Sequence, residues 1–135
     1  ARSHPIRKAL QRIAEVRKGS VALQRGLQVN GNFGDDTAEF FRVYEKNGVA
    51  QTALVLLNKS DEPVEFVVDK FVSVGSWRDA LADDVIEVSA SQPVLTATVG
   101  AHGIRVLLYD KPATNEALLK KLDALQVRAR RMNPE

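Results

Sequence analysis

The spacing of hydrophobic residues changes twice along the chain and divides it into three parts. Over residues 6–16 they recur at intervals of three and four, which is the period of an amphipathic helix. From residue 26 to residue 110 they alternate with polar residues or form short apolar runs, as β-strands do. Beyond Thr114 the helical period returns. The pattern predicts a mainly β chain with a helix at each end.

Turn-forming residues separate the strand-like segments of the middle part. The clearest signal is Asn47-Gly48, because a type I′ hairpin turn needs positive φ at both central residues. Short strands with tight connections and no helical segment between them favour an antiparallel Greek-key β-sandwich of about seven strands. The expected strands are Leu27–Asn30, Glu39–Lys46, Gln51–Leu57, Val64–Val68, Val85–Val88, Val94–Val99 and Ile104–Tyr109.

The stretch 54–66 is expected to hold two consecutive antiparallel strands joined as a hairpin. Leu54–Leu57 is apolar throughout, which is typical of a strand covered on both faces. Val64 and Phe66 alternate with Glu65, so the second strand is expected to have one wetter face. The polar turn between the two strands is interpreted as solvated and without a chemical role.

Local signals place the two terminal helices. Pro5 fits the first turn of the N-terminal helix, and Gly19 ends that helix. Residues 21–26 are expected to form an apolar connector into the first strand. The apolar stripe of the C-terminal helix is expected to fold back on this domain or on a neighbour rather than form a coiled coil. This stripe consists of Leu118, Leu122, Leu125 and Ala129, widened by Leu119 and Met132.

Composition narrows the function classes. A chain of 135 residues is the size of one domain, and without cysteine it has no disulfide, thiolate zinc site or cysteine nucleophile. No apolar run is long enough to span a bilayer, and the cellular compartment stays undecided. The net charge is +6 over residues 1–25, −7 over 26–110 and +3 over 111–135. The basic N-terminal part lacks interleaved aromatic residues, so a surface that meets another domain is favoured over nucleic-acid binding.

No residue pattern forms a recognisable catalytic centre. The acidic pairs at 35–36 and 83–84 lack the alternating oxygen-ligand spacing of a calcium loop, and adjacent carboxylates are common in turns. His4 and His102 stand apart from other ligand residues. The segment 31–34 has two glycines without the spacing of a phosphate-binding loop. We therefore assign no catalytic, metal-binding or cofactor-binding residue.

Two aromatic residues are candidates for contact with a sugar ring. Trp77 is the single tryptophan and follows a Gly-Ser turn, and Tyr109 ends the last expected strand. A ring at the mouth of a sandwich offers a flat apolar face for stacking. A lone tryptophan after a turn more often closes the end of a sandwich core, and this core interpretation is favoured for both residues.

Four short segments occur in an order that one enzyme family shares. The first is VRK at residues 16–18 with VALQRG at 21–26, and the others are VLLNKSDEPV at 55–64, WRDAL at 77–81 and AHGIRVLL at 101–108. Together they resemble the last barrel helix and the following β-sandwich, domain C, of α-amylase-family glycoside hydrolases. The connector has valine where the family usually has proline. The sequence of these segments most resembles bacterial cyclomaltodextrin glucanotransferase-like or α-glucosidase-like members.

The resemblance implies a division into parts and a non-catalytic role. Residues 1–25 would be the last helix of a missing catalytic barrel with its connector, 26–110 domain C, and 111–135 a helical extension. The family's paired catalytic carboxylates lie on the barrel, so this chain is expected to have no glycosidase activity of its own. Its expected partner is that barrel in cis, and its expected role is to stabilise the barrel and to contact α-glucan.

Two alternatives stay open at this point. One is a free-standing carbohydrate-binding sandwich that contacts glycan through Trp77. The other is an interaction module that self-associates, or binds an acidic partner, through the exposed faces of its terminal helices.

Overall fold

The computed structural model describes residues 11, 14, 18–46, 48–81 and 84–132. Residues 11, 14 and 18 are helical, and the remainder of the helix expected over 6–16 lies outside the described residues. Within the described ranges, no helix combines the length and the apolar character needed to cross a membrane.

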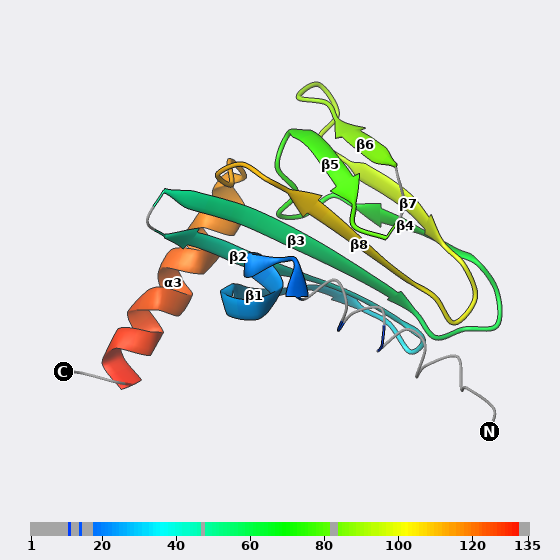
Figure 1. Ribbon diagram of the computed structural model, residues 1–135, viewed down its shortest axis with the longest axis horizontal. Coiled ribbons are helices and arrows are strands. Elements are labelled where there is room, and N and C mark those ends of the chain that lie inside the picture. Colours follow the sequence, from blue (N-terminus) through cyan, green and yellow to red (C-terminus); the bar gives the residue numbers. More distant parts are fainter. Residues whose placement is uncertain (1–10, 12–13, 15–17, 47, 82–83, 133–135) are drawn as a thin grey trace.

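In the described residues, eight strands form two antiparallel sheets, which confirms the expected mainly β fold (Figure 1). The larger sheet has the order β1-β2-β3-β8-β5-β6, and the smaller sheet pairs β4 with β7. The sequence pattern does not predict β5, because GSWRD contains a single large apolar residue. The strands are β1 (Leu27–Phe33), β2 (Thr37–Lys46), β3 (Val49–Asn58), β4 (Val64–Val68), β5 (Gly75–Asp79), β6 (Val85–Val88), β7 (Leu95–Val99) and β8 (Ile104–Tyr109).

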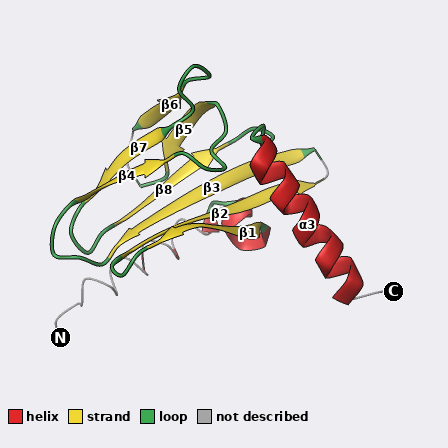
Figure 2. Ribbon diagram, turned by 180° about the vertical axis from the view of Figure 1, so that it is seen from behind, coloured by secondary structure: helices red, strands yellow, loops and turns green. Residues whose placement is uncertain are grey.

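The prediction of a hairpin over residues 54–66 is wrong. β3 pairs with β2 and β8 in the larger sheet, whereas β4 pairs with β7 in the smaller sheet. The polar turn after Asn58 therefore carries the chain from one sheet to the other (Figure 2). The local pattern specifies two strands and a turn, but the pairing partners are chosen by contacts between residues far apart in the sequence.

The hairpin between β2 and β3, by contrast, is confirmed by its strand pairing, and Asn47 of its turn lies outside the described residues. Lys46 pairs directly with Val49, which leaves a two-residue loop between β2 and β3. Gly48 has a φ of 79°, the left-handed conformation that a type I′ turn requires.

The main core lies between the two sheets. Trp77 and Leu54 from the larger sheet and Leu95 from the smaller sheet are fully buried in it. β3 also has a second buried face, where Ala53 and Val55 belong to another apolar cluster with the short helix described next. The apolar run in β3 is thus covered on both faces, as its sequence predicts.

The connector expected over residues 21–26 is a short helix, α2 (Val21–Arg25). Ser20 is its N-cap, and the Ser20 hydroxyl accepts a hydrogen bond from the Leu23 N–H at 3.3 Å. Ala22 and Leu23 are buried against the outer face of the larger sheet, where α2 contacts β2 and β3. The apolar residues of the connector are therefore the packed face of one helical turn.

The C-terminal helix α3 (Glu116–Met132) folds back on the sandwich. This is the first of the two positions expected for it, packing on this domain or on a neighbour. Leu118 is fully buried and Leu122 is 9% exposed, and both belong to the main core. The helix contacts β1 at the edge of the larger sheet (Figures 1 and 2). The inner face of the larger sheet is thus covered partly by β4 and β7 and partly by α3.

Two adjacent leucines of α3 test this packing. Leu118→Ala is expected to lower the free energy of unfolding by about 2–5 kcal/mol, because it leaves a cavity in the core. Leu119→Ala is the matched control: Leu119 is 40% exposed, and its replacement is expected to change stability by about 1 kcal/mol or less. Alanine favours helix at both positions, so urea unfolding reports the packing alone. Equal effects of the two substitutions would contradict the docked position of α3.

Candidate functional site

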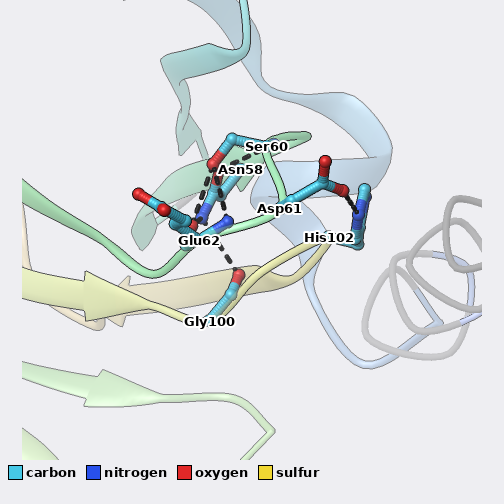
Figure 3. Close-up of polar contacts among 6 residues, drawn as sticks. All are labelled: Asn58, Ser60, Asp61, Glu62, Gly100 and His102. Carbon is cyan, nitrogen blue, oxygen red and sulfur yellow. Dashed lines mark hydrogen bonds and ion pairs between the residues drawn. The ribbon is translucent and has the colours of Figure 1, made fainter.

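The β3–β4 and β7–β8 connections meet at one end of the sandwich, where one side chain joins them (Figure 3). Asn58, the last residue of β3, is 1% exposed. Its amide nitrogen donates to the carbonyls of Glu62, Val99 and Gly100 at 2.8, 3.1 and 3.1 Å. Its amide oxygen accepts from the Ser60 N–H at 2.9 Å and from the Ser60 hydroxyl at 2.7 Å. A single buried amide therefore fixes the two connections to each other.

A side-chain contact between His102 and Asp61 lies on the solvent side of this junction. Nε2 of His102 and Oδ1 of Asp61 are 2.6 Å apart, and the two side chains are 32% and 93% exposed. Solvent therefore screens the pair. The Ser60 hydroxyl lies against Asn58 and Glu62 rather than against the imidazole. The cluster thus clamps two turns and has no nucleophile–base arrangement of the kind that covalent catalysis uses.

The two rings considered for sugar contact both lie in the core. Trp77 is fully buried, and its indole N–H donates to the Ser73 carbonyl at 2.9 Å. Tyr109 is 3% exposed, and its hydroxyl donates to the Val74 carbonyl at 2.7 Å. Their ring centroids are 5.0 Å apart. Neither ring presents a face to solvent, which is the core position that the sequence favours.

The acidic pairs take part in turns. The Asp36 carbonyl accepts from the Lys59 N–H at 2.7 Å, and the Asp84 carboxylate pairs with the Arg105 guanidinium at 3.1 Å. Asp83 and His4 lie outside the described residues. In the part of the chain that the structure describes, no group of three or more His, Cys, Asp or Glu side chains is placed to hold a metal ion.

The carboxylate of the WRDAL segment also has a structural position. The Asp79 side chain is 4% exposed and pairs with Nε of Arg105 at 3.0 Å. Its second oxygen accepts from the Leu81 N–H at 2.8 Å. Asp79 therefore holds the turn after β5 against β8, and the motif that supports the family resemblance is a packing motif.

A polar network that sequence analysis does not find joins the start of the sandwich to its end. Gln51 in β3 accepts from the Ser20 hydroxyl at 2.7 Å and donates to the Asp110 carboxylate at 2.8 Å. Arg78 donates to the same carboxylate at 2.6 Å. The hydrogen bond from Arg78 is the main cause that lowers the pKa of Asp110, and that bond raises the pKa of Arg78. The sequence signal that could have revealed this network is Gln51, a long polar side chain in a strand that is mostly apolar.

No family model and no curated protein matches the sequence. Solved structures match its fold. An α-amylase from Anoxybacillus superposes with a TM-score of 0.62 and 20% sequence identity, covering 80% of this chain and 23% of the amylase. CldA, a cyclomaltodextrin glucanotransferase with a three-domain ABC distribution, gives a TM-score of 0.52 and 21% identity, covering 79% and 22%. The expected structural match to α-amylase-family enzymes is confirmed at the level of the fold.

The fold likeness extends to an enzyme with a different name. α-Galactosidase I from Mortierella vinacea gives a TM-score of 0.51 and 18% identity, covering 71% of this chain and 27% of the galactosidase. In all three comparisons the chain covers only 22–27% of the matched enzyme. The fold is therefore that of one part of larger glycosidases, and it does not specify a substrate.

The junction at Asn58 can be tested with an isosteric pair of substitutions. Asn58→Asp replaces a donor that serves three carbonyls by an acceptor, and we expect it to lower the free energy of unfolding by about 2–4 kcal/mol. Asp61→Asn, at the exposed contact with His102, is expected to change the free energy of unfolding by less than about 1 kcal/mol. Urea unfolding at pH 7 measures both. If the two variants had the same free energy of unfolding within error, the Asn58 amide would not be what holds the β3–β4 and β7–β8 connections together.

Proposed function

We propose that this chain is the non-catalytic domain C of a larger α-amylase-family enzyme. In this proposal residues 1–25 are the last barrel helix and its connector, 26–110 are domain C and 111–135 are a helical extension. The domain packs against the catalytic barrel in cis and stabilises it. Hydrolysis or transfer of α-glucan is then the work of the barrel.

The observation that carries the proposal is the share of each chain that superposes. Four fifths of this chain corresponds to less than a quarter of the Anoxybacillus α-amylase. The four sequence segments that resemble the family support the same assignment, and two of them contain Asn58 and Asp79, which hold connections of the sandwich. The polar side chains described above hold connections of the sandwich in place. A rigid fold of this kind suits a domain whose role is to support a neighbouring domain.

A glycan-binding role for this domain has less support. The rings of Trp77 and Tyr109 are buried and hydrogen-bonded inside the core, so a sugar has no access to them. Stacking on aromatic faces is the main physical basis for binding sugar rings on a protein surface. The supporting role is therefore preferred to that of a free-standing carbohydrate-binding module.

The coding sequence upstream of Ala1 tests the assignment to a larger enzyme. We expect it to encode βα units of a barrel in the same reading frame, with paired carboxylates at strand ends. Sequencing the parent gene gives the answer directly. A stop codon in that frame close to Ala1, or a different upstream domain, would refute the proposal.

A titration with maltoheptaose separates the supporting role from glycan binding. The tryptophan fluorescence of the purified chain is expected to stay unchanged, and calorimetry is expected to show no saturable heat. The same preparation should release no reducing sugar from starch. Saturable binding would favour the carbohydrate-binding module, and turnover would place a catalytic site in this chain.

A further inference from the structure

Glu39 places a carboxylate inside the sandwich. It lies on β2 two residues before Phe41, on the face that packs in the main core, and it is 4% exposed. Among the residues that the structure describes, none is a hydrogen-bond partner of its Oε2 atom. Burial of a carboxylate without full hydrogen bonding is strongly unfavourable, so such a group needs an explanation beyond packing.

The surroundings of Glu39 leave room for the carboxylate but do not neutralise it. A Cβ atom at Gly31 in β1 would lie 2.8 Å from Oε2, so any other residue there would collide with the carboxylate. Asn32, next to Gly31 in β1, acts on Glu39 through its backbone and its side chain. The charged groups that face Glu39 are Asp69 and Lys70, both exposed. Burial is the main cause that raises the pKa of Glu39, and Asp69 adds to it, while Asn32 and Lys70 act against it.

Asp69 and Lys70 begin the connection from β4 to β5, residues 69–74, which we call the strap. Phe71 in the strap has a φ of 65°, a strained conformation for an aromatic residue. Its ring packs edge-on against Phe41, with centroids 6.1 Å apart. The strap therefore closes over the strand that carries Glu39.

The strap also holds the start of α3. The Ser73 hydroxyl accepts from the Thr114 N–H at 3.1 Å, and the Val72 carbonyl accepts from the Asn115 side chain at 3.2 Å. Asn115 in turn caps α3 by accepting from the Leu118 N–H at 3.0 Å. Opening of the strap would therefore loosen the attachment of α3 to the sandwich.

We propose that Glu39 is a pH-sensitive latch beneath the strap, which stays closed when the carboxyl is protonated and opens more readily when it is ionised. An ionised carboxylate regains hydration when the strap lifts, and it moves away from the charge of Asp69. The latch is a property of the sandwich itself and holds whatever the chain is joined to.

The direction of the pH dependence follows from the raised pKa of Glu39. The closed form binds the proton more tightly than the open form, so protonation favours closure. The strap is held closed less strongly as the pH rises from 4.5, the ordinary pKa of a glutamate, to the raised pKa of Glu39. Above that raised pKa, a further rise in pH changes the strength of closure no more.

Hydrogen exchange measured by mass spectrometry tests the latch in the full chain. Peptides that cover the strap and the start of α3 are followed from pH 4.5 to pH 8, with intrinsic exchange rates divided out. In the wild type, protection of these amides is expected to fall as pH rises, by up to about tenfold per pH unit within the titration range of one group. Glu39→Gln is expected to keep the strap protected at pH 8 and to abolish the pH dependence. Glu65→Gln, an exposed carboxylate on β4, is the matched control and should behave as the wild type.

Two surface substitutions give a second test that does not disturb the core. Asp69→Asn is expected to move the midpoint of strap opening to lower pH, and Lys70→Gln to move it to higher pH, because the two charges act on Glu39 in opposite directions. A wild-type profile without pH dependence, a Glu39→Gln profile that parallels the wild type, or midpoints unmoved by both surface substitutions would overturn the latch.

Discussion

β3 is apolar on both faces over residues 53–57, and each face is covered by a different part of the domain. Leu54 and Leu56 face the smaller sheet, so β4 and β7 have to lie over them. Ala53 and Val55 face the opposite way and pack in the cluster that contains α2. A strand of this kind cannot lie at the edge of a sheet, and β3 accordingly sits between β2 and β8. The order of elements around β3 follows from the need to bury both of its faces.

Much of this arrangement can be predicted from the sequence. Alternation or short runs of apolar residues locate seven of the eight strands in the described residues, because a half-buried strand repeats every two residues and a strand buried on both faces is apolar throughout. The Asn47-Gly48 turn is predictable because few residues adopt positive φ without strain. The burial of Leu118 and Leu122 follows from their spacing of four, which places both on one face of α3. These features depend on residues close together in the chain.

Features that depend on distant residues are missed. Nothing in the sequence around Asn58 shows that its amide reaches Val99 and Gly100, so the step from one sheet to the other looks like a hairpin turn. β5 is polar at alternate positions and too short for a clear pattern, and its Trp77 is interpreted as a residue after a turn. A signal for Glu39 is present: it stands two residues from Phe41, so alternation places it on the buried face. The sequence does not show that a glycine and a strap make room for a carboxylate there.

The buried polar side chains differ in what they do for the fold. Ser20 fixes the start of α2, Asn58 the step between sheets, Ser73 the start of α3 and Asp79 the turn after β5, and each has hydrogen bonds that offset its burial. Such groups specify connections, since a displaced connection would leave them unpaired inside the protein. Among the described residues, Oε2 of Glu39 and Oγ1 of Thr52 are buried without a hydrogen-bond partner, and of these two side chains only Glu39 can ionise. A group that is fully satisfied in one arrangement stabilises that arrangement, whereas a group that is not satisfied keeps a second arrangement within reach. The site of conformational adjustment in this domain is therefore the strap over Glu39 rather than the better-bonded junction at Asn58.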